Sequence, residues 1–349
     1  MSKTIVGVDI GADTLRAVEI SGAASSRPTL VRFGEIRLPQ GSVSRGEVLE
    51  PQTVADVLKT LWSQAGFKSK QVVLGMGNQR VLARDLTVAK ASKARIKESL
   101  PFQVQDMLPV PVADALLDFY PVSEGVGEHG PVINGLLIAA VKDAVLGNVR
   151  ASKLAGLTTI GVDLIPFAVT RLLVDRGQAP ETVALIDIGA STTSVVLVSS
   201  GVPQFVRIIP SGGDDVTKDL AARLEIPTEL AEGAKRTLGL VSTSTVQEDR
   251  VASSVIFETV NELLGSLRNT VSYYANTRPQ ETVSRIVLTG GGARLLGLPE
   301  ALAEVTRLPV VEADPFDSIA FGRSVAQDEL RRNASSYTVA LGLALGSAA

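Results

Sequence analysis

The stretch "VDIGADTLRAVEI", residues 8–20, returns in altered form as "IDIGASTTSVVLV", residues 186–198. In both, an apolar run ends at an Asp, a turn begins at a Gly, and a second apolar run follows. A constant offset aligns identical residues: Asp9 with Asp187, Ile10 with Ile188, Gly11 with Gly189, Ala12 with Ala190, and Thr14 with Thr192. A gap-free repeat of this kind is typical of a duplicated structural unit. Because β-branched or alternating residues follow each turn, each copy predicts a β-hairpin.

A hairpin at this position predicts a phosphate site unlike that of a P-loop or a dinucleotide fold. Those folds place their glycines between a strand and a helix, whose N-terminus holds the phosphate. In a hairpin, the backbone N–H groups of the turn are the donors, and the second copy adds the hydroxyls of Ser191, Thr192 and Thr193. Asp9 and Asp187 end strands that we expect to face each other, and their carboxylates suit a hydrated Mg²⁺. A single Asp-x-Gly turn is an ordinary turn, but two matched copies favour a nucleotide site.

A glycine-rich turn late in the chain is a third element of the pattern. The stretch "SRIVLTGGGARLLGLPEALAEV", residues 284–305, predicts a strand, a turn and then a helix that starts near Pro299. Three consecutive glycines, residues 290–292, let the backbone approach a flat ligand where a side chain would collide. On its own, this stretch is also typical of a generic turn between a strand and a helix.

Two charged residues lie between these elements on a predicted helix. Gly212 and Gly213 precede one helical stretch, and the next carries Glu232 and Lys235, which are three residues apart and so within one turn of each other. Such a pair is usually a solvated surface ion pair. In a nucleotide cleft, the same pair holds a ribose and the edge of an adenine, so both interpretations stay open at this point.

The composition excludes several other kinds of site. The 349 residues are 45% hydrophobic, which is enough for the cores of two domains. There is no Cys, so disulfides and thiolate metal sites are excluded, and the only His, His129, lies in the turn-like "EGVGEHGP", where we expect a solvated loop residue and not a member of a Ser-His-Asp triad. The net charge of −3 gives no basic footprint for nucleic acid. No apolar run is long enough to span a membrane and no signal peptide is recognisable, so we expect a cytoplasmic protein without direct membrane insertion.

The duplicated hairpins, the "TGGGA" turn at 289–293 and the "AEGAK" helix at 231–235 resemble the actin-like ATPase superfamily. The whole chain is more similar to one branch of it, the PilM family of type IV pilus assembly, to which the cell-division protein FtsA is related. The motif "LPFQ" at 100–103 resembles the extra subdomain of that branch, and the chain's end resembles the PilM terminal helix without the membrane-targeting tail of FtsA. The resemblance implies an α/β, actin-like (ribonuclease H-like duplicated) two-domain fold with a nucleotide cleft and a small inserted subdomain.

The resemblance also implies a division of the chain into four parts. These are the core of domain I at 1–83, 154–180 and 336–349; an inserted PilM/FtsA-type subdomain at 84–153; the core of domain II at 181–212 and 266–335; and a small subdomain of domain II at 213–265.

ATP and Mg²⁺ are the cofactors that the resemblance implies. The residues implied to face the phosphates and Mg²⁺ are Asp9, Gly11, Thr14, Arg16, Asp187, Gly189, Ser191, Thr192 and Thr193. Those implied to face the ribose and adenine are Gly212, Gly213, Glu232, Lys235, Gly290, Gly291, Gly292 and Ala293. Asp9 and Asp187 are implied to hold the metal through water.

Two departures from the family pattern bear on nucleotide binding and turnover. The first hairpin carries Asp13, whose carboxylate would repel phosphate, and Arg16 where the family commonly has a Lys. On the helix that links the domains, Ile165 stands where an acid or a Gln would orient the attacking water, and Asp163 is nearby. We therefore assign no catalytic residue. We expect ATP to set the angle between the domains, with slow or absent hydrolysis.

The function implied by the resemblance is that of a nucleotide-binding scaffold at the inner face of the cell membrane. Its implied partners are the N-terminal tail of a PilN-like bitransmembrane protein and the pilus assembly ATPase. We expect the tail to dock between the first domain's sheet and the inserted subdomain, where the apolar residues are Leu100, Phe102, Val104, Met107 and Leu108. Two alternatives stay open. Liposome co-sedimentation would reveal an FtsA-like cell-division protein, and sugar-stimulated ATP consumption would reveal a small-molecule kinase.

Overall fold

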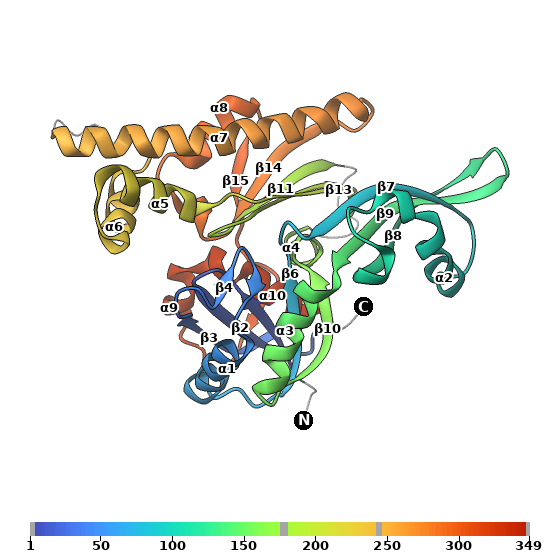
Figure 1. Ribbon diagram of the computed structural model, residues 1–349, viewed down its shortest axis with the longest axis horizontal. Coiled ribbons are helices and arrows are strands. Elements are labelled where there is room, and N and C mark those ends of the chain that lie inside the picture. Colours follow the sequence, from blue (N-terminus) through green and yellow to red (C-terminus); the bar gives the residue numbers. More distant parts are fainter. Residues whose placement is uncertain (1–3, 175–180, 242–245, 347–349) are drawn as a thin grey trace.

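The computed structural model describes residues 4–174, 181–241 and 246–346. Two large sheets lie one above the other, and a smaller sheet projects at one end of the molecule (Figure 1). The predicted domain ranges that include residues 1–3, 175–180 and 347–349 extend beyond the described residues at those points. The mixture of sheets and covering helices confirms the predicted α/β class.

The first large sheet has the strand order β10-β6-β1-β2-β3-β16. In that order, the strand bounds are Thr158–Leu164, Gln71–Met76, Thr4–Ile10, Thr14–Ser21, Thr29–Arg37 and Ala320–Phe321. Its two faces are covered by two pairs of helices, α1 (Pro51–Ala65) with α3 (Lys142–Leu154), and α4 (Ile165–Leu173) with α10 (Thr338–Gly346). Helix α10 packs directly on β1 at Gly7, where a Cβ atom would lie 2.0 Å from the carbonyl oxygen of Ala340.

The second large sheet has the strand order β13-β12-β11-β14-β15. In that order, the strand bounds are Val202–Ile209, Thr193–Ser199, Thr182–Ile188, Val283–Thr289 and Val310–Glu312. The helices of this domain are α5 (Gly213–Leu224), α6 (Thr228–Leu238), α7 (Gln247–Thr277) and α8 (Leu298–Thr306). The long helix α7 runs along the outer face of the sheet (Figure 1).

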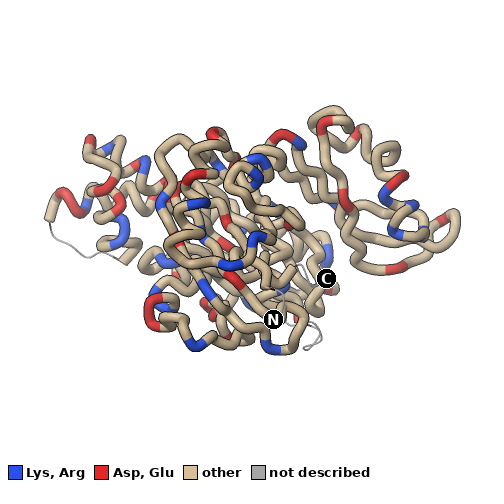
Figure 2. The backbone as a smooth tube through the Cα atoms, turned by 90° about the horizontal axis from the view of Figure 1, so that it is seen from below, with Lys and Arg blue, Asp and Glu red and all other residues tan. Residues whose placement is uncertain are grey.

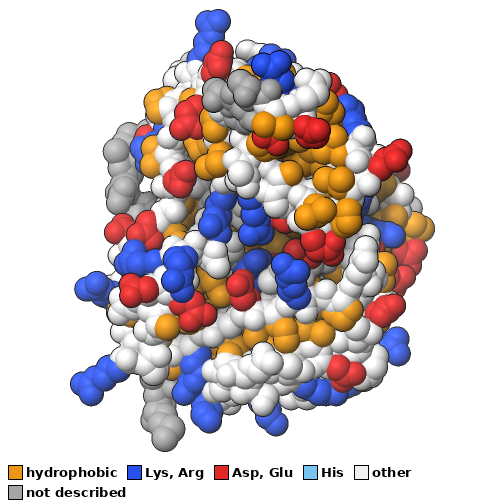
Figure 3. Space-filling view, turned by 90° about the vertical axis from the view of Figure 1, so that its left-hand side faces the viewer, with side chains coloured by type: hydrophobic (Ala, Val, Ile, Leu, Met, Phe, Trp, Pro, Cys, Tyr) orange, Lys and Arg blue, Asp and Glu red, His pale blue; other side chains and the backbone are white. Residues whose placement is uncertain are grey.

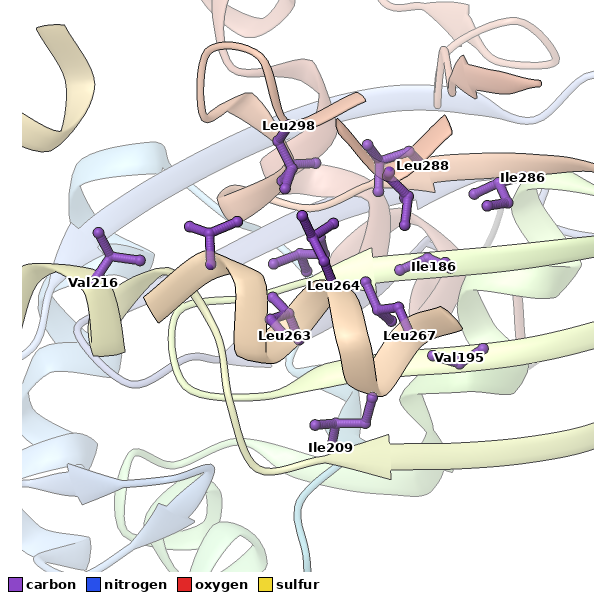
Figure 4. Packing of buried hydrophobic residues seen from close by; sticks show 14 of the residues in the cluster. Ile186, Val195, Ile209, Val216, Leu263, Leu264, Leu267, Ile286, Leu288 and Leu298 are labelled. Carbon is purple, nitrogen blue, oxygen red and sulfur yellow. The ribbon is translucent and has the colours of Figure 1, made fainter. Parts of the chain in front are cut away.

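Helix α7 is held to the second sheet by a row of leucines. Leu263, Leu264 and Leu267 are buried and belong to the same cluster as Ile186 of β11 and Leu288 of β14 (Figure 4). Burial of one such side chain contributes about 1.5–3 kcal/mol, so this row stabilises the helix more than its intrinsic propensity does. The cluster fixes the sheet against the helices that surround the candidate site.

The smaller sheet has the strand order β7-β9-β8 and forms a lobe at one end of the molecule (Figure 2). Its elements are β7 (Val81–Ala89), α2 (Lys93–Gln103), β8 (Ala115–Gly127) and β9 (Gly130–Val141). Among the apolar residues of 100–108, for each of which a place in the subdomain's own core was the more expected of the two roles, Leu100 and Val104 are buried in the core of this lobe with Phe119. Phe102 is 85% exposed. Figure 2 shows positive and negative residues interspersed along the whole chain.

One hydrophobic cluster joins all three sheets. It contains Ile5 and Leu343 of the first domain, Leu136 of the small sheet, and Val183 and Val196 of the second sheet. The small lobe therefore packs against both domains rather than hanging from one of them. An ion pair between Arg278 and Asp85 (3.3 Å) adds a second contact between the lobe and the second domain.

The remaining elements are short. They are β4 (Val43–Ser44), β5 (Glu47–Val48), α9 (Gln327–Arg332), and 3₁₀ turns at Gln105–Met107, Val112–Asp114, Gly292–Arg294 and Ala334–Tyr337. Among the residues that the structure describes, no helix is both long enough and apolar enough to cross a membrane.

Candidate nucleotide site

The two quoted stretches form hairpins with the same turn. Strand β1 pairs antiparallel with β2, and β11 pairs antiparallel with β12, as predicted. In the first turn, the Gly11 N–H donates to the Thr14 carbonyl at 3.1 Å, and in the second, the Gly189 N–H donates to the Thr192 carbonyl at 2.9 Å. The duplication seen in the sequence is therefore also a duplication of backbone geometry.

The carboxyl groups of Asp9 and Asp187, one from each hairpin, point toward the space between the domains. Since side chains alternate along a strand, Asp9 lies on the face of β1 that carries Ile5, and Asp187 lies on the face of β11 that carries Val183. Ile5 and Val183 belong to the cluster that joins the two domains, so both faces are turned toward the opposite domain.

Burial makes both carboxyl groups reluctant to ionise. It raises the pKa of Asp9 to about 6, although Arg16 partly opposes this. It raises the pKa of Asp187 to about 7, and the nearby charge of Asp9 adds to the effect. Asp187 is buried and Asp9 is half-buried, and two carboxyl groups that repel each other in such a place are suited to a cation with oxygen ligands. Because no group of three or more metal-ligating side chains occurs within residues 4–174, 181–241 and 246–346, a metal here would keep several waters.

Three glycines let other loops pack against the second hairpin. A Cβ atom on Gly212 would lie 2.5 Å from the Gly189 carbonyl oxygen, and one on Gly290 would lie 2.3 Å from the Ile188 carbonyl oxygen. A Cβ atom on Gly292 would lie 2.5 Å from the Ile188 side chain. We expected the glycines of the "TGGGA" turn to make room for a flat ligand. At Gly290 and Gly292, however, the atoms that a Cβ would meet first belong to the second hairpin. These glycines therefore allow the turn after β14 to pack closely on that hairpin.

A cavity of about 310 Å³ lies beside the converging loops, between α5, α6, α7 and the segment that precedes α8. The predicted residues that line it are Gly212, Gly213, Glu232, Lys235, Gly291 and Gly292. Ala293 is only 4% exposed and packs in the core of the second domain. In the face of the molecule shown in Figure 3, the surface is hollowed near the middle, and Lys and Arg side chains gather around the hollow.

Glu232 and Lys235 form the polar wall of this cavity. The Lys235 ammonium donates to the Gly213 carbonyl at 3.0 Å and to the Thr217 hydroxyl at 2.8 Å, and it pairs with Glu232. Partial burial acts to raise the pKa of Glu232, but hydrogen bonds from Lys235, Thr217 and Arg236 outweigh it and hold the pKa below its usual value. The pair is therefore only partly exposed and belongs to a network that ties α5 to α6.

Several side chains that line the cavity or contact its lining residues were not predicted from the sequence. Thr217 donates to Glu232 at 2.7 Å, and Arg236 donates to it at 2.7 Å. Arg236 follows Glu232 by four residues, so helical spacing alone could have indicated it. Thr217 comes from a different helix, and no local pattern joins it to Glu232. Arg294 also lines the cavity and donates to Asn333 at 2.6 Å.

The hydroxyl groups of the second hairpin differ in whether they are already hydrogen-bonded within the protein. Thr193 is fully buried, and its hydroxyl donates to the Ser211 carbonyl at 2.8 Å. This hydrogen bond ties the hairpin to the loop before α5. Ser191 and Thr192 make no side-chain hydrogen bond to any residue in the described part of the chain, so their hydroxyls are available to a ligand.

Two charged residues distinguish the first hairpin. Arg16 lies opposite Asp9 in the hairpin register, and its guanidinium pairs with Glu35 at 3.1 Å. Asp13 is exposed at the turn. Burial raises the pKa of Asp214, at the start of α5, and the charge of Asp13 adds to this. Asp13 therefore lies near the second domain, across the space that a phosphate chain would cross.

The structure gives Ile165 and Asp163 packing and pairing roles. Ile165 begins α4, and its side chain fills the space above Gly75 and Gly77, where Cβ atoms would approach it to 3.0 and 2.9 Å. The carboxylate of Asp163 pairs with Arg171 at 2.9 Å. An apolar side chain at Ile165 cannot orient water, and Asp163 is already engaged within its own domain.

Comparisons with known proteins agree with this geometry. The sequence matches the family described as "Type IV pilus assembly protein PilM" over residues 7–348. The chain is similar to the cell-division protein FtsA of Bacillus subtilis (22% identity, 89% of this chain and 78% of that protein) and of Pseudomonas aeruginosa (24%, 90% and 84%).

Solved structures show the same fold. A structure titled as the PilM-PilN type IV pilus biogenesis complex matches with a TM-score of 0.87 and 28% identity, over 99% of this chain and 98% of that one. The MreB5 protein of Spiroplasma citri bound to ADP matches with a TM-score of 0.55 and 14% identity, over 97% and 94%. The predicted actin-like fold is therefore confirmed.

Replacing Gly290 by Ala tests the convergence of the loops. Gly290 has a φ of +95°, where a Cβ is strained whatever the space around it. We expect Gly290→Ala to lower the free energy of unfolding by about 1–3 kcal/mol, measured by thermal or urea denaturation. The matched control is Gly291→Ala, whose φ is −65° and whose Cβ would meet nothing closer than 3.5 Å. Equal losses in the two variants would contradict the packing argument.

Replacing Asp187 by Asn tests the burial of the carboxyl pair. Above about pH 4 the unfolded chain loses the Asp187 proton, whereas the folded protein keeps it up to about pH 7. The folded state then binds more protons, so these carboxyls make the metal-free protein less stable as the pH rises through this window. We expect Asp187→Asn to raise the melting temperature by several degrees at pH 8 in EDTA, and to have little effect at pH 4. A variant that melts lower at pH 8 would refute this.

Proposed function

The chain belongs to the type IV pilus assembly protein PilM family, and from this premise we propose that it is a cytoplasmic ATP-binding scaffold of pilus assembly. In this proposal, it recruits the N-terminal tail of a PilN-like inner-membrane protein and links that platform to the assembly motor. The observation that supports it most is the match of nearly the whole fold to the PilM of a PilM-PilN complex. The small lobe, β7 to β9 with α2, is part of that match, since 99% of the chain is covered.

The nucleotide would lie across the two hairpins and the cavity beside them. The turns at Gly11 and Gly189, with the free hydroxyls of Ser191 and Thr192, would face its phosphates. Asp9 and Asp187 fit a hydrated Mg²⁺, because both are oxygen donors whose pKa values are raised by desolvation, and the charge of Arg16 offsets this only in part and only at Asp9. A bound cation would reduce the repulsion between the two carboxylates and would also neutralise part of the charge of the phosphates.

In this proposal, the nucleotide acts as a clamp between the domains. One hairpin belongs to each domain, so a ligand that contacts both stabilises their approach. Ile165 offers no group to orient water, and Asp163 is paired with Arg171. Slow or absent hydrolysis follows from these two residues, and the clamp requires no more than binding.

A second cavity, which we call the subdomain cavity, would hold the partner's tail. It has a volume of about 980 Å³ and lies where the small lobe, α4 and the second sheet meet. Its lining includes Tyr120 of β8 and Phe167 of α4, whose ring centroids are 4.6 Å apart. The cavity adjoins the first domain and the lobe, where the tail is expected, but also the second domain, and its lining does not include the apolar residues of 100–108.

Thermal melting with Mg-ATP tests nucleotide binding. We expect Mg-ATP to raise the melting temperature of the wild type, because a ligand of the folded state alone stabilises it by mass action. Asp187→Ala should abolish this shift, and Asp9→Ala should do the same if both hairpins hold the cation. If the wild type shows no shift at millimolar Mg-ATP, repulsion by Asp13 is the first explanation, and Asp13→Ser should restore the shift. If Mg-ATP does not raise the melting temperature of Asp13→Ser either, the proposal of nucleotide binding is refuted.

A bulky side chain in the subdomain cavity tests tail docking. Ser318 is exposed and lines the cavity, so Ser318→Trp would fill part of it without disturbing a core. We expect this variant to lower the affinity for a fluorescent peptide of the PilN-like tail at least tenfold, measured by anisotropy. Ser123→Trp, exposed on β8 outside the cavity, is the control. Unchanged affinity in Ser318→Trp, with its Mg-ATP response intact, would place the docking site elsewhere.

A further inference from the structure

We infer that the subdomain cavity selects a segment in which Lys or Arg stands beside apolar side chains. The inference deepens the proposed docking function and rests on it. It comes from the charges that line the cavity, which are not balanced within the described part of the protein.

The basic side chains of the cavity are mostly neutralised already. Arg171 pairs with Asp163 at 2.9 Å and also donates to the Gly342 carbonyl at 2.9 Å. Arg285 pairs with Glu181. Only Lys93, at the start of α2, lines the cavity without an ion pair to another described residue.

The acidic side chains are in excess. Asp118 of β8 lines the cavity, and its carboxylate accepts only the N–H of the next residue among the described groups. In a second lining segment, which begins at the end of β15, Glu312 and Asp317 are exposed and make no ion pair with any described residue. Asp314 of that segment is 3.5 Å from Arg331. Three carboxylates thus remain uncompensated against the single ammonium of Lys93, and they come from two separate segments of the chain.

The same cavity is also lined by apolar side chains. Tyr120, Phe167, Val287 and Val311 are among them, and Val311 is 49% exposed. A lining that combines apolar side chains with an excess of carboxylates fits a peptide that carries both apolar and cationic side chains. A purely apolar segment would leave the carboxylates without partners, and an acidic one would be repelled.

The occupant to which this points is a cytoplasmic tail of an inner-membrane protein. Cytoplasmic segments close to a membrane span carry an excess of Lys and Arg. Such a tail is short and disordered when free, so it gains affinity by laying a few side chains into a groove that is already formed. The excess of carboxylates therefore complements the chemistry of the partner that the proposed function requires.

Binding of two synthetic tail peptides tests the inference. The first is the native N-terminal tail of the PilN-like protein from the same organism, and the second has each Lys and Arg replaced by norleucine. The protein variant is the full chain with Asp118→Asn, Glu312→Gln and Asp317→Asn. At low salt we expect the variant to bind the native tail about tenfold more weakly than the wild type does, and with a flatter salt dependence. Its affinity for the norleucine tail should be unchanged or higher.

A charge-matched control separates local from general electrostatics. Glu98→Gln, Glu128→Gln and Glu304→Gln remove the same charge at exposed positions outside the cavity, two of them on the lobe itself. We expect this variant to bind the native tail within twofold of the wild type. Equal losses in both triple variants would overturn the inference. So would equal affinity of the wild type for the two peptides, which would leave docking itself intact. If neither peptide binds the wild type, the docking proposal fails.

Discussion

The close approach of three backbones at the second hairpin is the constraint on which the site depends. The loop before α5 and the turn after β14 both press on the carbonyl groups of Ile188 and Gly189, and each can do so only at a glycine. Hydrogen bonds fix this contact, since the Gly213 N–H donates to the Gly189 carbonyl at 3.0 Å. Because α5 starts from one of these loops, the position of Thr217 and, through it, of Glu232 and Lys235 follows from the same contact.

The carboxyl pair destabilises the folded protein, whereas the close packing of the loops at the glycines stabilises it. Asp9, which is half-buried, and Asp187, which is buried, are held near each other by strands whose pairing is fixed over their whole length. Within the described residues, neither side chain finds a hydrogen-bond donor that would explain its burial. Raised pKa values of this origin are typical of functional sites, where a bound ligand of opposite charge removes the repulsion. The rigid hairpins therefore keep the two groups in place, and a cation would relieve the strain.

The features of the site that depend on neighbouring residues could be predicted from the sequence, and those that depend on contacts between distant segments could not. The two hairpins, the helix after Gly212 and Gly213, and the spacing of Glu232 and Lys235 depend on neighbouring residues, and all were predicted. The contacts made by Thr217 and Thr193 join segments far apart in the chain, so no local pattern could show them. The role of Gly290 was predicted in part, because a sequence shows that a side chain is excluded there but not which neighbour excludes it. Phe102 and Leu100 are two residues apart, yet only the structure separates the exposed side chain from the buried one.

The hydrophobic cluster that joins the three sheets makes the lobe an integral part of the fold. Leu136 of β9 packs in the same cluster as Val196 of β12 and Leu343 of α10, so removing the lobe would expose apolar surface of both domains. The walls of the subdomain cavity come from these same three parts, with Tyr120, Phe167 and Val287 as examples. A cavity of this kind exists only while the three parts are packed together. Its shape and its excess of carboxylates are therefore properties of the assembled chain, and the lobe alone would carry only one of its walls.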